Sequence, residues 1–374
     1  MRNTIYRYFF KEFISYFLLI LVSLSVIVWI VQAVNYLDFV TEDGHSFKVY
    51  FTYSILNIPK VLGRLIPLVF LISLLITMLQ FEKNNELLVL WTSGLNKIHM
   101  VNLSIKIALL ITLIQFFLSL VVSHSSLNYG RSILRASDIT LFPSLLKEKK
   151  FNDTVENLTV FVEKKKSNGE MLNIFLRDDR SSVSQSKTII AKSGFIAKKN
   201  QENILNLFDG TIQTEKKNGK INFLNFNRTE INLSKFSTKT ITTPKIQEID
   251  TLSLLHCVKP FLEKEKAALE EIQCESSRDI KSELNRRFGM PLYIPFISII
   301  ICYMLYSKKE NRFYYFQKYI VFLFAFISLV LAEIMVRYSG LSNINSIVYY
   351  SLPPLFILIN YLNLLRIFKF ENLN

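Results

Sequence analysis

Cysteine, glycine, tryptophan and histidine are all scarce in this chain of 374 residues, which has 3 Cys, 10 Gly, 2 Trp and 4 His. None of the glycines begins a GxxxxGK(S/T) phosphate-binding loop, and neither HExxH nor GxSxG occurs. No CxxC is present, and three scattered cysteines are too few for a disulfide scaffold. The sequence therefore predicts no catalytic residue, no cofactor and no metal site.

The few reactive side chains have structural interpretations. Cys302 lies in an apolar run, where packing is its expected role. Cys257 and Cys274 could pair only if their segment faces an oxidising compartment, and the sequence leaves both alternatives open. The segment Ser123–Ser126 (SHSS) combines Ser and His where an apolar run ends, but it has no obvious acid partner. We interpret it as a set of polar groups at a membrane interface.

Long hydrophobic runs are abundant. Half of the residues are hydrophobic and 31 are Phe, yet the middle of the chain is polar and charged. Six runs are each about long enough to cross a hydrocarbon core of about 30 Å: Phe13–Val34, Val61–Phe81, Val101–Ser123, Pro291–Tyr306, Tyr319–Val336 and Ile347–Leu365. The first reads as an uncleaved anchor, because no A-x-A site follows it. The short fourth run is expected to begin before Pro291.

The polar middle, from about His124 to Arg287, has the pattern of β-strands separated by turns. Ser167–Glu170, Asp209-Gly210 and Asn218-Gly219 are typical hairpin turns. The strands expected between them are Leu158–Glu163, Leu172–Leu176, Thr188–Ala191, Phe195–Ala197, Ile204–Phe208, Thr211–Thr214 and Ile221–Phe226. Their spacing favours a sandwich or a jelly roll. A solvated amphipathic helix, Leu262–Ile272, is expected to lead back to the membrane.

These elements predict a membrane protein with six helical spans in a 3+3 arrangement and a β-domain inserted between spans three and four. The predicted divisions are 1–123 for spans one to three, 124–287 for the β-domain with flanking helical segments, and 288–374 for spans four to six. Short loops rich in Lys and Arg all fall on one side. The positive-inside rule then places both termini in the cytoplasm and the β-domain outside.

Between spans two and three lies a connector, residues 82–99, that is longer than a minimal turn; we call it the coupling stretch. Leu87, Leu88, Leu90 and Trp91 predict an apolar helix face, Glu86 a polar one, and Gly94 a helix end. Two interpretations remain open at this point. The helix rests on the lipid surface, or it fits a groove in a soluble partner.

Charged and proline residues inside the spans have competing explanations. Arg64 snorkels to the head groups or contacts a substrate. Glu333 and Arg337, one turn apart, read as a self-neutralising pair. Pro59 and Pro67 predict kinks in the second span. The formal net charge of +14 suits anionic head groups as well as nucleic acid, and with six spans we expect no nucleic acid.

Several motifs, in order along nearly the whole chain, resemble the F/G-type permeases of the lipopolysaccharide export transporter. Residues 85–90 (NELLVL) with 93–95 (SGL) resemble that family's coupling-helix motif, and residues 7–13 (RYFFKEF) its lead-in to span one. Pro59 with residues 66–68 (IPL) resembles its span two. Glu283, Arg287 and Pro291 resemble the E-x-x-x-R-x-x-x-P that opens span four. The last motif and residues 175–180 (FLRDDR) favour the F-type subunit.

The resemblance implies an inner-membrane permease subunit that extracts lipopolysaccharide and passes it to a periplasmic bridge. Its implied partners are a cytoplasmic ATPase dimer, which uses the ATP, a second six-span permease, a single-span periplasmic jellyroll partner and the periplasmic bridge protein. The β-domain would be a periplasmic jellyroll. The resemblance also implies that Glu86, Leu87, Leu90, Trp91 and Gly94 couple to the ATPase.

For the lipid, the resemblance implies a lateral gate formed by spans one and five and an acyl-chain path along the jellyroll. Candidate path residues are Phe161, Phe175, Leu207 and Phe223, which an ordinary sandwich core would explain as well. The end of span one, VQAVNYL at residues 31–37, lacks the basic residues that family members often have there. Phosphate contacts would then come from Arg64, from the partner subunit, or not at all.

Two other function classes compete with this hypothesis. A membrane-anchored scaffold or sensor would bind a periplasmic partner through its β-domain, and no ATPase would co-purify with it. A membrane-embedded enzyme would need several titratable groups at one depth, where the sequence offers only Glu333 and Arg337.

Overall fold

The structure, a computed structural model, describes residues 2–41, 46–145, 148–155, 158–166, 169–179, 187–199, 202–215, 221–232, 245–258, 277–306 and 314–371. The chain divides into two units. We call Met1–Ile30, Asn57–Leu127 and Ile246–Asn374 the helical unit. We call Val31–Leu56 and Asn128–Lys245 the sheet unit. Leu262–Ile272, Cys274 and Asn218-Gly219 lie outside the described residues, so the helix and the turn expected there stay predictions, and the conditional pairing of Cys257 with Cys274 stays open.

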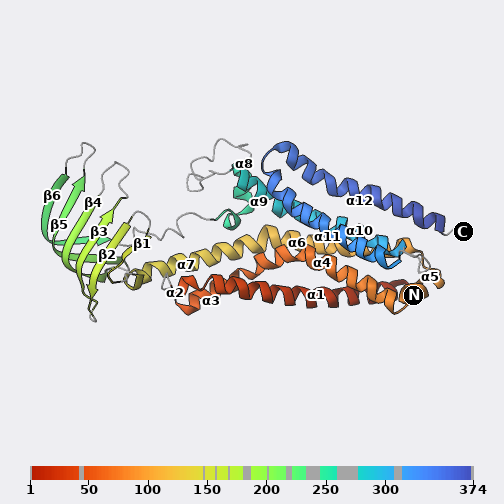
Figure 1. Cartoon of the computed structure of the whole chain (residues 1–374), viewed down its shortest axis with the longest axis horizontal. Helices are drawn as coiled ribbons and strands as arrows, with labels where there is room; N and C mark the ends of the chain where they lie inside the picture. Colours follow the sequence, from red (N-terminus) through yellow and green to blue (C-terminus); the bar gives the residue numbers. More distant parts are fainter. Residues whose placement is uncertain are drawn as a thin grey trace. The chain divides into compact units, whose positions relative to one another are not determined.

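The helices before the sheet are α1 (Arg2–Asn35), α2 (Asp38–Thr41), α3 (Phe47–Leu56), α4 (Ile58–Lys83), α5 (Glu86–Thr92), α6 (Lys97–Phe117), the π-helical turn η1 (Leu118–Val122) and α7 (Ser123–Leu145). Those after it are η3 (Ile246–Glu248), α8 (Thr251–Val258), α9 (Ser277–Gly289), η5 (Met290–Leu292), α10 (Tyr293–Cys302), η6 (Tyr303–Tyr306), α11 (Tyr314–Ser339) and α12 (Asn343–Glu371). In Figure 1, α5, the N-terminal end of α1 and the C-terminal end of α12 lie at one end of the helical unit, and α8 and α9 lie toward the other.

Six segments of the described chain are long and apolar enough to span a membrane, three before the sheet and three after it. They are Thr4–Thr41, Phe47–Lys83, Lys97–Leu134, Arg278–Tyr306, Phe316–Ser339 and Asn343–Lys369. The 3+3 prediction is confirmed, and the fourth span does begin before Pro291. Helices α1, α11 and α12 leave many large apolar side chains exposed. Such surfaces are stable only where lipid or a partner covers them.

The fourth span is the centre of the helical unit. Every residue of α10 is buried, and α10 packs against α4, α6, α11 and α12. An all-round apolar helix is typical of such a central position. The prolines of span two act differently from each other: Pro67 lies inside α4, whereas Pro59 lies in its first turn. Proline fits a first turn without loss of a hydrogen bond. Span two is interrupted directly before Pro59, at Asn57 between α3 and α4, so the proline lies at a break in the span.

The sheet unit contains one antiparallel sheet in which consecutive strands pair in order from β1 to β6. Its strands are β1 (Phe151–Val155), β2 (Leu158–Lys165), β3 (Met171–Asp178), β4 (Lys187–Lys199), β5 (Glu202–Glu215) and β6 (Ile221–Asn232). The β2–β3 hairpin is confirmed at Gly169, whose φ is +84°. Two predictions are wrong: 188–191 and 195–197 form one strand, and Asp209-Gly210 lies inside β5.

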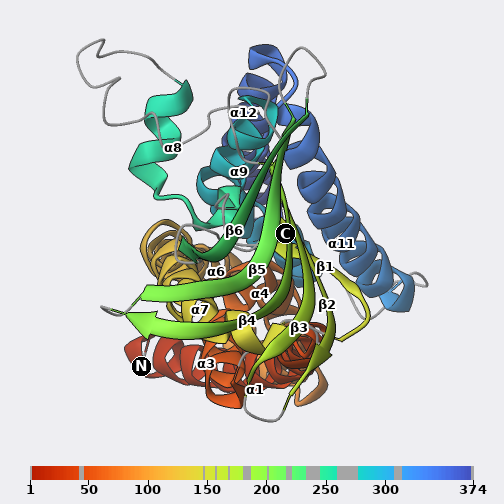
Figure 2. The same cartoon turned by 90° about the vertical axis from the view of Figure 1, so that its left-hand side faces the viewer.

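The reason for both errors is a bend across the sheet rather than a chain reversal. Asn173 in β3 and Asp209 in β5 have positive φ, of 50° and 49°. A single left-handed residue within a strand shifts the alternation of side chains, as a bulge does. In β3, Met171 and Ile174 are both buried although they are three residues apart. Figure 2 shows β4 and β5 bending along their length. The Asp-Gly pair therefore bends β5 and does not end it.

One close helix contact in the helical unit gives a stability prediction. A Cβ added to Gly289 would lie 2.0 Å from Cε1 of the buried Tyr349, whereas one added to Gly63 would meet nothing nearer than 3.8 Å. We expect Gly289→Ala to cost about 1–3 kcal/mol through overpacking. Thermal unfolding in detergent should show a lower midpoint for Gly289→Ala and an unchanged or higher one for Gly63→Ala. Equal midpoints for the two variants would contradict this packing.

Candidate functional site

Two features of the helical unit stand out: the coupling stretch and a charged pocket. The coupling stretch folds as predicted into a short helix, α5, set off from α4 by Asn85 in the left-handed conformation (φ 58°). Gly94 has a φ of +81°, and the amide of Leu95 donates to the carbonyl of Leu90 at 3.1 Å. A left-handed glycine with this bond pattern is a common helix ending. Asn96 then caps α6 by accepting from the amide of Ile98 at 3.1 Å.

The apolar residues of α5 divide between two faces. Leu90 is 9% exposed, and Leu87 and Trp91 are half-buried against the core of the helical unit. Leu88 and Val89 are 56% and 64% exposed. Leu87, Leu90 and Trp91 thus share one apolar face, as predicted, and the prediction is wrong for Leu88, which lies outside that face. The apolar residues left for another molecule are Leu88 and Val89.

Polar contacts fix α5 to both halves of the helical unit. Glu86 accepts a hydrogen bond from Nδ2 of Asn84 at 3.0 Å. The ammonium group of Lys97 lies 6.0 Å from the ring centroid of Trp91 and 5.7 Å from that of Phe368, in α12. A cation at this distance from an aromatic face is attracted by the ring quadrupole. The start of α6 and the end of α12 thus hold α5 in place.

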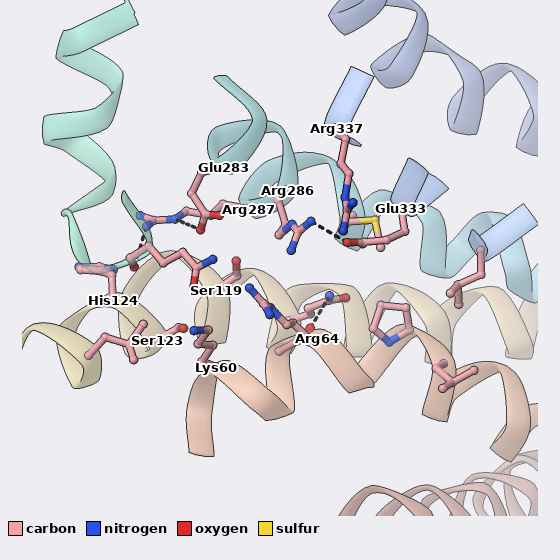
Figure 3. A pocket seen from close by; sticks show the side chains of 18 residues that line it. Lys60, Arg64, Ser119, Ser123, His124, Glu283, Arg286, Arg287, Glu333 and Arg337 are labelled. Atoms are coloured by element: carbon pink, nitrogen blue, oxygen red, sulfur yellow. Dashed lines mark hydrogen bonds and ion pairs between the residues drawn. The ribbon is translucent and has the colours of Figure 1, made fainter. Parts of the chain in front are cut away.

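The charged pocket, of about 340 Å³, lies inside the helical unit. Figure 3 shows charged side chains from α4, α9 and α11 pointing into it. Its charged and polar lining comprises Lys60, Arg64, Gln115, Ser119, Ser123, His124, Gln247, Glu283, Arg286, Arg287, Glu333 and Arg337. Five of these are Lys or Arg and two are Glu, which leaves an excess of three positive charges. Such a cavity favours an anionic ligand.

Arg287 forms a deeply buried part of the pocket wall. Its side chain is 3% exposed and lies 3.2 Å from a carboxylate oxygen of Glu283. It also donates to the carbonyls of Ile249 and Gln247, both at 3.1 Å, and to Oγ1 of Thr251 at 2.8 Å. A buried guanidinium is stable only when its donors are satisfied in this way. The structure thus brings together Glu283 and Arg287 of the motif, and it gives Arg287 a structural role between α9 and the segment before α8.

Pro291, the third residue of that motif, is the middle residue of the tight η5 turn that follows α9. Its carbonyl accepts a hydrogen bond from Oγ1 of Thr112, in α6, at 3.3 Å. Thr112 also donates to the carbonyl of Ala108 within its own helix, at 2.8 Å. The motif therefore links span three, span four and the segment before α8.

Arg286 and Glu333 form a second ion pair in the pocket, between α9 and α11. Nη2 of Arg286 lies 2.6 Å from Oε1 of Glu333, and the side chains are 24% and 43% exposed. Glu333 therefore pairs across two helices, and the self-neutralising pair predicted with Arg337 is wrong. Within the described residues, Arg337 has no ion pair. The sequence could not reveal the Arg286–Glu333 pair, because the two residues are 47 positions apart along the chain.

His124 has an acid partner, contrary to the interpretation of the SHSS segment. Its Nε2 lies 2.9 Å from Oδ1 of Asp250, which precedes α8. The hydroxyl of Ser125 lies 3.3 Å from the same Nε2. A relay needs the acid and the nucleophile on opposite ring nitrogens, so these three residues are not arranged for acyl transfer. No cluster of metal-binding side chains occurs among the described residues.

The other pocket residues come from α4 and from a break in span three. Lys60 and Arg64 lie one turn apart at the start of α4 and point into the pocket (Figure 3). Opposite them, the π-helical turn η1 contains Ser119 and is followed by Ser123. A π-helical turn is often found at functional sites because it redirects the side chains that follow. The sequence identified Arg64 but gave no signal for this turn.

The candidate path residues of the sheet do not share one face. Phe161 and Phe175 are paired neighbours on one face, and Phe223 lies on the same face by register. Leu207, fully buried, belongs to the core on the other face. On the core side, one end of the sheet opens into a cleft of about 830 Å³. Its apolar lining includes Leu176, Ile189, Ile212, Leu224 and Ile231.

Two groups of three spans around a sheet domain define a multi-span membrane protein with a charged cavity among its helices. The chain matches the family model described as lipopolysaccharide export system permease LptF/LptG over residues 7–367, and it belongs to that family. It is also 29% identical over 237 residues to the uncharacterized protein RP871 of Rickettsia prowazekii (strain Madrid E). That alignment covers 63% of this chain and 64% of the relative.

The two arginines of the pocket should differ in their effect on folding. Arg287→Met would leave Glu283, which is 16% exposed, as an unpaired buried charge, at a cost of about 3–5 kcal/mol. Arg286→Met, at a more exposed pair, should cost about 1 kcal/mol or less. Folded yield and thermal midpoint in detergent measure the difference. An Arg287→Met variant as stable as Arg286→Met would contradict the structural role of Arg287.

Proposed function

We propose that this protein is a non-catalytic permease subunit of an ATP-driven exporter that extracts lipopolysaccharide from the inner membrane. The observation that carries the proposal is the family match over residues 7–367 together with the 3+3 arrangement around a sheet domain. The protein would change its affinity for lipid as it changes conformation. ATP hydrolysis would come from a separate cytoplasmic ATPase dimer.

The proposed membrane orientation rests on the basic short loops. Lys and Arg near both ends and in the coupling stretch place these segments in the cytoplasm by the positive-inside rule. The sheet unit is then periplasmic. Within the proposed complex, the chain would pair with a second six-span permease, a single-span jellyroll partner and a periplasmic bridge protein. The E-x-x-x-R motif at Glu283 favours the F-type subunit.

The coupling stretch is the proposed contact with the ATPase. Its exposed surface consists of Leu88, Val89 and the flanking polar residues, with Glu86 half-buried beside them. Two apolar side chains would enter a groove, and one carboxylate would fix the register. Leu87, Leu90 and Trp91 would then transmit the push to the core they pack against, rather than contact the ATPase themselves.

The charged pocket is the proposed site for the phosphate groups of the lipid. Arg64 and Lys60 on α4 supply cations there. They would take the place of the basic residues that the end of span one lacks. Arginine suits phosphate because its planar donors match two oxygens at once. The cleft in the sheet unit, whose lining is partly apolar, is the proposed path for acyl chains.

Glu86→Ala tests the coupling proposal. The variant should still insert and co-purify in mild detergent with the ATPase and the second permease, because the apolar contacts remain. In reconstituted vesicles it should hydrolyse ATP but release less lipopolysaccharide. Thr92→Ala, an exposed substitution at the end of the same helix, is the control. Undiminished release by Glu86→Ala would count against the mechanism, and wild-type protein that brings no ATPase would favour the scaffold alternative.

Arg64→Gln tests the pocket proposal. Loss of one cation should weaken binding of a bis-phosphorylated lipid A about 10-fold, since a charge-assisted hydrogen bond contributes about 1.5–3 kcal/mol. Binding of the dephosphorylated lipid should change little. Lys106→Gln, an exposed cation elsewhere on span three, is the control. Equal losses for both lipids would show that Arg64 acts through packing and not through phosphate.

A further inference from the structure

One ion pair of the helical unit lies far from the pocket and has no part in the coupling mechanism described so far. Nζ of Lys318, near the start of α11, lies 2.7 Å from Oε2 of Glu82, near the end of α4. The two side chains are only 21% and 14% exposed. Partly buried charges at this distance hold each other firmly, because separating them leaves each one poorly solvated.

The two helices joined by this pair both reach the pocket with their other ends. On α11, Glu333 lies 15 residues after Lys318, a distance of roughly 22 Å along the helix. Glu333 is held there by Arg286. On α4, Arg64 lies 18 residues before Glu82 and lines the same pocket. Thus α4 and α11 are joined directly at the coupling end, and α11 is fastened to α9 at the pocket end.

Between these two ion pairs, α11 buries mainly small side chains against its neighbours. The buried residues of this part of α11 are Val321, Ala325 and Ala332, all small or β-branched, whereas most of its large side chains are exposed. A helix that buries small residues can shift against its neighbours without large side chains having to leave deep holes. Its position is therefore set to a large extent by the polar contacts at its ends.

We propose that Glu82 and Lys318 are positioning residues that link the coupling stretch to α11. Glu82 lies in the last turn of α4, three residues before the Asn85 turn into α5, so a displacement of α5 reaches α11 through this contact. Because α11 carries Glu333, the displacement changes the Arg286–Glu333 side of the pocket. The direction of the push rests on the proposed function; the link between the two helices does not.

The first experiment tests the link on the protein alone. Spin labels are placed at two exposed positions, Leu113→Cys on α6 and Leu331→Cys on α11. Pulsed electron paramagnetic resonance then measures the distribution of distances between the labels, which reports the position of α11 relative to α6. Glu82→Gln and Lys318→Gln should each broaden or shift the distance distribution. The charge swap Glu82→Lys with Lys318→Glu should restore it, and Lys369→Gln, an exposed change at the same end of the unit, should leave it unchanged. An unchanged distribution in both single variants, or no recovery in the swap, overturns the proposal.

The second experiment uses the purified complex in vesicles that contain lipopolysaccharide. Glu82→Gln and Lys318→Gln should retain the ATPase and its hydrolysis, while lipid released per ATP falls about fivefold or more, as for two coupled sites. The swap should recover most of the release, which a general loss of stability would not allow. Release per ATP that stays at the wild-type value in both single variants overturns the proposal. If wild-type protein binds no ATPase, the proposed function fails, and the spin-label result alone decides on the link.

Discussion

Compensation of buried charge is the constraint on which the helical unit depends. Its outer surface is apolar along α1, α11 and α12, yet five cationic side chains line a pocket in its interior. Charges in such surroundings are costly unless each one is paired or solvated. Arg287 meets this demand with one carboxylate and four backbone or hydroxyl acceptors. Arg286 meets it with Glu333, which belongs to another helix. The ion pairs therefore decide which helices can lie next to one another.

These pairs also determine which parts of the pocket can respond to a ligand. Arg287 is enclosed and has several acceptors, so an anion could not recruit it without breaking the segment before α8. Among the described residues, Arg286 has one acceptor, Glu333, and that acceptor is partly exposed. Arg64 and Lys60 stand on the opposite wall. In the proposed function, a phosphate would meet the α4 side and the Arg286–Glu333 side, while the Arg287 side supports the wall.

The coupling stretch, at the other end of the unit, likewise depends on contacts with neighbouring elements. A helix of seven residues is too short to be stable on its own, and α5 is held by Leu90 in the core, by Lys97 between two aromatic rings and by the turns at each end. Its exposed residues can then act on a partner without the helix unravelling. In the proposed function, this rigid attachment would let the short helix transmit a displacement to the spans.

The sequence by itself determined the six spans, the sheet between them, the coupling helix and its Gly94 ending, because each depends on local apolar periodicity or on turn-forming residues. It also determined the family motifs and identified Arg64 as a charge within a span. Only the tertiary structure decided which face of α5 is free, since burial of Leu87, Leu90 and Trp91 depends on spans distant in sequence. The same holds for the partners of Glu333, His124 and Glu82, each of which lies on a different helix or segment. Asp209-Gly210 shows the physical reason most simply: a left-handed residue permits either a turn or a bend, and pairing with the neighbouring strands selects the bend.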